Sequence, residues 1–120
     1  MARTREIVGA GISPLAASNI TGSETTGATA AGTTQANAYA IGSAMVEFTT
    51  VAASTGAVLP TGSDLGDTFY IWNGGASTLT LYPPGTDTVN NGSTSFAIAT
   101  MKSCIIWKTS NTHWATNLTA

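Results

Sequence analysis

The chain has 120 residues, of which only 8% are charged, and its formal net charge at neutral pH is -2. Ordinary soluble domains carry about 25% charged residues, and four basic residues are too few for the clustered Lys and Arg of a nucleic-acid surface. One histidine, His113, and one cysteine, Cys104, leave a catalytic centre without its usual parts and allow no intrachain disulfide. We therefore expect a non-enzymatic protein with no catalytic residue, cofactor or metal.

Residues 1–35 hold mainly Ala, Gly, Ser and Thr, with few large side chains. Because so little apolar surface cannot stabilise a fold alone, we predict an extended N-terminal arm over 1–35. The apolar residues of this arm, which we expect to contact a partner, are Ile7, Val8, Ile12, Leu15 and Ile20. The apolar stretch after the basic start is too short for a signal peptide, and no run approaches the ~20 residues of a membrane helix. The sequence thus predicts synthesis in a cytoplasm and no membrane partner.

Residues 36–120 show short runs of Thr, Val, Ile and aromatic residues between Gly, Asn, Asp and Pro, a pattern typical of strands and turns. No apolar pattern recurs at helical spacing. The predicted strands lie at 36–41, 44–52, 57–60, 67–73, 78–83, 95–101, 102–109 and 113–118. Eight short strands at even spacing predict an all-β body over 36–120, a small β-sandwich or jelly roll.

Turn-forming residues separate these strands. Asn73-Gly74-Gly75 predicts a hairpin into the strand at 78–83, because these residues tolerate positive φ. Pro83-Pro84-Gly85 ends that strand, since proline cannot donate a ladder hydrogen bond. Ser110-Asn111-Thr112 is predicted to link the last two strands.

Two predicted strands, 67–73 and 102–109, are apolar on both faces, because successive side chains of a strand point to opposite sides. In a two-layer protein only one face of a sheet meets the core. The second face must be covered by the arm or by another subunit, unless the long aromatic side chains simply cover the outer surface. The candidate subunit-interface residues are Tyr70, Trp72, Ile105 and Trp107.

Other candidate sites have a structural explanation beside the functional one. His113 could contact a ligand or simply end a strand at the rim, and Asp64 and Asp67 could form a turn, since a calcium loop needs more oxygen ligands. Cys104 stands beside two isoleucines, which favours burial over reactivity. The aromatic residues could stack on a sugar, or pack in a core or an interface; they are Tyr70, Trp72, Trp107 and Trp114.

Several short motifs follow one another between residues 32 and 118. They are Gly32-Thr33-Thr34-Gln35-Ala36, Val46-Glu47-Phe48-Thr49-Thr50-Val51, Gly56-Ala57-Val58-Leu59-Pro60, Tyr70-Ile71-Trp72-Asn73-Gly74-Gly75-Ala76, Leu79-Thr80-Leu81-Tyr82-Pro83, Gly85-Thr86-Asp87-Thr88-Val89-Asn90 and Trp114-Ala115. Their order resembles a small β module of tailed-bacteriophage virion proteins, which include capsid decoration (cement) proteins and fibre-associated proteins. The resemblance implies a jelly-roll-like body, commonly trimeric, and no catalytic residue.

What the resemblance implies is a virion structural protein on the outer capsid surface, made in the host cytoplasm. Its partners would be itself, as a homotrimer, and the major capsid protein. Low charge suits this role, because the cores of permanent interfaces are depleted in charged residues. The alternative is a fibre-head or receptor-binding module that recognises a host surface glycan. Residues 1–31 lie outside the resemblance, so the role of the arm follows from composition alone.

Overall fold

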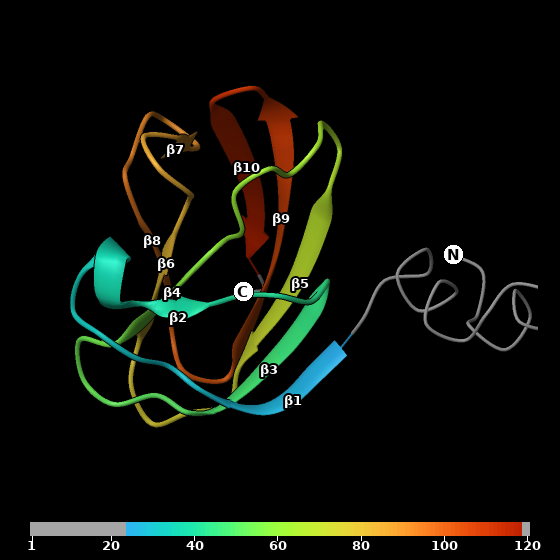
Figure 1. Cartoon of the computed structure of the whole chain (residues 1–120). Coiled ribbons are helices and arrows are strands. Elements are labelled where there is room, and N and C mark those ends of the chain that lie inside the picture. Colours follow the sequence, from blue (N-terminus) through green and yellow to red (C-terminus); the bar gives the residue numbers. More distant parts are fainter. Residues whose placement is uncertain (1–23, 119–120) are drawn as a thin grey trace, which may run out of the picture.

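Ten strands in two sheets organise residues 24–118, the part of the chain that the computed structural model describes (Figure 1). The larger sheet holds, in spatial order, β1 (Glu24–Thr29), β3 (Met45–Thr50), β5 (Thr68–Asn73), β9 (Lys102–Ser110), β10 (His113–Leu118) and β7 (Thr88–Val89). The smaller sheet holds β2 (Tyr39–Ala40), β4 (Gly56–Val58), β6 (Leu79–Tyr82) and β8 (Phe96–Ile98). The only helical element in this range is a 3-10 turn, η1 (Gln35–Asn37).

The first six strands alternate between the two sheets. In the larger sheet β1, β3 and β5 pair in parallel, and in the smaller sheet β2, β4 and β6 do the same. Each coil of the chain therefore contributes one strand to each sheet. The next coil stacks on it, as in a short β-solenoid of three coils.

After β6 the chain reverses its direction. β8 pairs antiparallel with β6, and β9 pairs antiparallel with β5, so both strands run against the coil on which they lie. β9 and β10 form an antiparallel hairpin at the predicted Ser110-Asn111-Thr112 link, and β7 pairs in parallel with β10 at the sheet edge. These antiparallel strands cover one end of the solenoid.

The structure confirms the predicted all-β class but corrects its architecture. A β-sandwich or jelly roll joins neighbouring antiparallel strands, whereas the connections here run from one sheet to the other and return in parallel. Asn73-Gly74-Gly75 accordingly does not form a hairpin, because β5 and β6 lie in different sheets. Gly75 passes so close to Val51 that a Cβ at this position would lie 2.5 Å from the Val51 amide nitrogen. The turn thus leads the chain from the larger sheet to the smaller one.

All eight predicted strands are present, and the prediction missed β1 and β7. The sequence pattern does not indicate β1, because its residues are small and polar. This strand nevertheless pairs with β3 and buries Ala28. Residues 24–35 were predicted to belong to the arm, and this boundary is corrected because β1 and the buried Ala30 belong to the body. The body therefore includes Glu24 and all that follows it up to Leu118.

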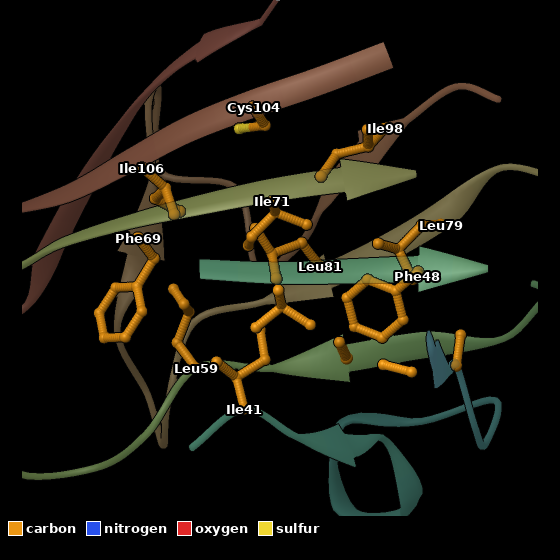
Figure 2. Packing of buried hydrophobic residues seen from close by; sticks show 14 of the residues in the cluster. Ile41, Phe48, Leu59, Phe69, Ile71, Leu79, Leu81, Ile98, Cys104 and Ile106 are labelled. Atoms are coloured by element: carbon orange, nitrogen blue, oxygen red, sulfur yellow. The ribbon is translucent and has the colours of Figure 1, made fainter. Parts of the chain in front are cut away.

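The core lies between the two sheets, where the inward side chains of both meet (Figure 2). The largest fully buried apolar residues include Val46, Phe48, Leu59, Ile71, Leu79, Leu81, Ile98, Ile106 and Trp114. Tyr39 packs edge-on against Phe48, with ring centroids 5.4 Å apart. Since each coil supplies inward residues at alternate positions, the core extends continuously through the three coils.

Candidate interaction surface

Outward side chains of the larger sheet form rows that cross several strands. In one row Met45 of β3 lies beside Tyr70 of β5, and Tyr70 lies beside Ile105 of β9. In the next row Glu47 is paired with Trp72. Directly paired side chains on one face of a sheet are in contact distance, so these residues form one continuous surface.

This surface is apolar and open to solvent. The exposed fractions are 46% for Tyr70, 40% for Met45 and 37% each for Trp72 and Ile105. Together these four residues are called the apolar face below. They line a shallow groove of about 280 Å³, whose polar lining includes Glu47. A contiguous cluster of large exposed apolar side chains marks an interaction surface more often than scattered single residues do.

The outer face of the smaller sheet has a different character. One outward row holds the exposed Ala40 and the half-buried Val58 and Tyr82, and the next holds the buried Gly56, the half-buried Thr80 and the exposed Ala97. The hydroxyl of Tyr82 donates a hydrogen bond to the Thr33 carbonyl at 3.4 Å, which ties that ring to its own chain. None of the large apolar side chains that are exposed within residues 24–118 belongs to the strands of this sheet, so the apolar face distinguishes one side of the molecule from the other.

Three of the four predicted interface residues belong to the apolar face: Tyr70, Trp72 and Ile105. Trp107 is half-buried on the same side of the sheet, in the row that contains Thr68. The sequence analysis missed Met45, although alternation in the predicted strand at 44–52 places it opposite the buried Val46. The candidate arm residues, Ile7, Val8, Ile12, Leu15 and Ile20, lie outside the described residues.

His113 has structural partners at the start of β10. Its Nε2–H donates to the Asn90 carbonyl at 2.6 Å, and its Nδ1 is hydrogen-bonded to the Thr109 hydroxyl at 2.6 Å. Both ring nitrogens thus join β10 to neighbouring segments at the rim of the sheet. Of the two alternatives in the sequence analysis, this arrangement corresponds to the position at the rim, although His113 begins its strand rather than ending one.

Asp64 and Asp67 close a turn on themselves. The Asp64 amide donates to the Asp67 carboxylate at 2.9 Å, and the Asp67 amide donates to the Asp64 carbonyl at 3.1 Å. Within residues 24–118, no three His, Cys, Asp or Glu side chains gather into a group that could hold a metal ion. The two hydrogen bonds between Asp64 and Asp67 therefore identify these residues as turn formers.

Cys104 points from β9 into the core, where it is 1% exposed (Figure 2). Burial raises the pKa of this thiol from 9.0 to about 11, and a backbone hydrogen bond involving Asn117 partly opposes the shift. The thiolate, which is the reactive form, is therefore scarce at neutral pH.

We expect Cys104 to resist a thiol-specific reagent near neutral pH in the native protein and to react fully once the chain is unfolded. With a reagent that releases a coloured product on reaction with a thiol, absorbance measures the labelling rates of the native and of the unfolded protein. The thiol ionises at a lower pH in the unfolded chain than in the folded protein. The free energy of unfolding should therefore also fall as the pH rises from 9.0 to about 11. Rapid labelling of the native protein would contradict the burial of this side chain.

Comparison with known proteins adds no relative: no protein-family model matches the chain, and no curated protein is significantly similar to it. A search of the described part of the chain for helices of membrane-spanning length and apolarity finds none.

Proposed function

We propose that the protein is a non-enzymatic structural component of a tailed-bacteriophage virion that decorates and stabilises the capsid as a homotrimer. The observation that carries this proposal is the apolar face, a set of exposed large side chains on adjacent strands of the larger sheet. The phage setting and the trimer follow from the resemblance of residues 32–118 to virion modules.

The composition of the apolar face favours a protein partner. Tyr and Trp dominate the energetics of protein interfaces because they bury a large area and lose little conformational freedom. Met45 and Ile105 extend the two rings into a surface that is apolar across three strands. Because 8% of the residues are charged, association would bury few charges that need partners.

The capsid contact is a separate part of the proposal. The trimer would sit on the outer surface of the shell and bind the major capsid protein, with the apolar residues of the N-terminal segment as additional contacts. Imaging of the intact particle tests this role directly. Density for the trimer at hundreds of symmetric positions on the shell supports decoration, and density confined to the tail or its fibres overturns it.

Replacing the aromatic residues of the apolar face should disrupt the oligomer before it disrupts the fold. We expect Trp72→Ala to weaken self-association by roughly 30- to 500-fold, the range for loss of a central interface tryptophan. Tyr70→Ala should act in the same direction. Sedimentation velocity over a concentration series measures the change, and circular dichroism verifies that each variant is folded.

The matched control is Thr80→Ala, which alters an outward position on the smaller sheet. We expect this variant to associate like the unmodified protein. If the unmodified protein stays monomeric at high micromolar concentration, or if Trp72→Ala associates normally, the apolar face is not the subunit interface.

One observation favours the alternative, a fibre-head or receptor-binding module for a host surface glycan. Trp72 is paired with Glu47 beside the groove, and an exposed ring next to a carboxylate can stack on a sugar and accept a hydrogen bond from its hydroxyl. The number of copies on the particle separates the two roles. Hundreds of copies indicate decoration, whereas tens or fewer, together with specific glycan binding that Trp72→Ala removes, indicate a fibre head.

A further inference from the structure

Asparagine is followed by glycine twice in this sequence, at Asn73-Gly74 and at Asn91-Gly92. Such a pair is chemically labile, because the backbone nitrogen of the second residue can attack the side-chain amide of the first, and glycine has no Cβ to hinder the approach. The attack requires a side chain that can turn and a glycine nitrogen that is available. The chemistry of the two pairs is the same, so the fold decides which of them reacts.

At Asn73-Gly74 the fold holds both reacting groups. The Asn73 side chain is completely buried, and three hydrogen bonds fix its amide nitrogen and its oxygen. The Gly74 amide donates to the Phe48 carbonyl at 2.8 Å. A Cβ at Gly74 would lie 2.8 Å from Nε1 of Trp72, so the space around this backbone is filled. Attack at this pair therefore requires local unfolding.

At Asn91-Gly92 the same two groups are accessible. Both residues are exposed in the turn that Val89 and Ser93 close, which follows β7 at the upper end of the molecule in Figure 1. Among residues 24–118 the Asn91 side chain has no hydrogen-bond partner, and the Gly92 amide donates no hydrogen bond. Apart from its chain neighbours, no described atom lies within 4 Å of the position that a Cβ of Gly92 would take.

The base of this turn is fixed, so the accessible pair lies at the tip of an ordered segment. Val89 and Ser93 exchange two backbone hydrogen bonds, of 2.8 and 3.0 Å. The Asn90 amide donates to the Trp114 carbonyl at 2.8 Å, and the Asn90 side chain forms two hydrogen bonds with Thr116, of 2.8 and 3.1 Å. The neighbouring asparagine is thus held by β10, and the tip alone is unrestrained.

We propose that Asn91 is a site of spontaneous deamidation in the folded protein and that Asn73 is protected from it. The Gly92 nitrogen loses its proton to hydroxide and attacks Cγ of Asn91. A bond from this nitrogen to Cγ forms, the bond from Cγ to Nδ2 breaks, and ammonia leaves with a proton taken from water. Water then opens the cyclic imide at Cγ to give aspartate, or at the backbone carbonyl carbon to give isoaspartate. One water is consumed and one ammonia is released, without oxidation or reduction.

Either product adds one negative charge to a chain whose net charge is -2. Isoaspartate also routes the main chain through Cβ and Cγ, which lengthens the turn by one backbone atom beside the anchored Asn90. This inference does not rest on the proposed function. In the larger sheet β10 separates β7 from β9, so the modified turn contains no residue of the apolar face.

Ageing of the purified native protein at mildly alkaline pH tests the proposal. Peptide mapping by mass spectrometry follows the conversion of amide to acid at each asparagine, and isoelectric focusing follows the acidic form. We expect Asn91 to convert to aspartate and isoaspartate. Asn73 should convert at least about 100-fold more slowly, because its reaction waits for a rare opening of the fold. In urea that unfolds the chain, the two rates should approach each other.

Asn91→Gln is the matched variant, because it keeps an exposed amide and moves it one methylene further from the Gly92 nitrogen. It should fold normally by circular dichroism and lose the acidic form that appears first in the unmodified protein. Equal rates at Asn91 and Asn73 in the native protein overturn the proposal. So does an Asn91 that stays intact in the native protein while it converts in urea, or an acidic form that persists in Asn91→Gln.

Discussion

Trp114→Ala is expected to lower the free energy of unfolding by about 3–5 kcal/mol, the range for removal of a buried tryptophan. The Trp114 side chain is completely buried on β10, where its ring packs against Phe69 with centroids 5.9 Å apart. Its Nε1–H donates to the Asp87 carboxylate at 3.0 Å, and the Lys108 ammonium lies 5.9 Å from the ring centroid. Truncation therefore leaves a large cavity and a partly buried carboxylate without its donor.

Urea denaturation measures this loss of unfolding free energy. The slope of the transition is compared between variants, because a change in midpoint at constant slope reports a change in stability. Trp114→Phe separates the two contributions: it retains most of the packing and removes the hydrogen bond, so it should cost about 1.5–3 kcal/mol. Trp72→Ala removes the same side chain from a position where 37% of it is exposed, and should cost less than Trp114→Ala in the dissociated subunit. The burial of Trp114 is contradicted if its truncation costs no more than that of Trp72.

Asn73→Ala is the second change with a large expected effect, a loss of about 3–5 kcal/mol. The Asn73 side chain is completely buried, and its amide donates to the Ser77 carbonyl at 2.9 Å and to the Ile98 carbonyl at 2.8 Å. Its side-chain oxygen accepts from the Gly75 amide at 3.0 Å. Removal strands three backbone groups away from water, at about 1–3 kcal/mol each and less than additively.

These hydrogen bonds hold the point where the third coil leaves β5 and crosses toward β6 and β8. We therefore expect the loss to appear in hydrogen exchange as well, with the amides of the 73–77 turn and of β8 losing protection first. Urea denaturation gives the change in the free energy of global unfolding. Asn111→Ala, at an exposed turn residue, should stay within about 0.5 kcal/mol of the unmodified protein. Comparable losses for the two substitutions would show that Asn73 does not anchor the turn.

The apolar face connects the fold to the proposed role. Parallel stacking brings β3 and β5 together, and the reversal of the chain adds β9 beside β5. Three strands that lie far apart in the sequence thus place Met45, Tyr70 and Ile105 in one row. A rigid sheet holds these side chains in a fixed arrangement, which limits the entropy that association costs.

The amino-acid sequence by itself determined eight of the ten strands between residues 24 and 118 and the alternation of their side chains. Alternation in 67–73 and 102–109 separates Phe69, Ile71, Cys104 and Ile106 from the candidate interface residues, and the structure buries these four. The same alternation placed Tyr70, Trp72, Ile105 and Trp107 together on the other face, where the first three are exposed and Trp107 is half-buried. This inference works because a strand has a side-chain period of two whatever its neighbours are.

Only the tertiary structure decided which strands pair and in which direction. A strand with one buried face has the same pattern in a jelly roll as in a solenoid coil, so the residues of β5 do not reveal that it pairs with β3 and β9 rather than β6. β1 illustrates the same limit, because Glu24–Thr29 has few apolar residues and becomes a strand by pairing with β3. Pairing is a long-range property, and local composition does not encode it.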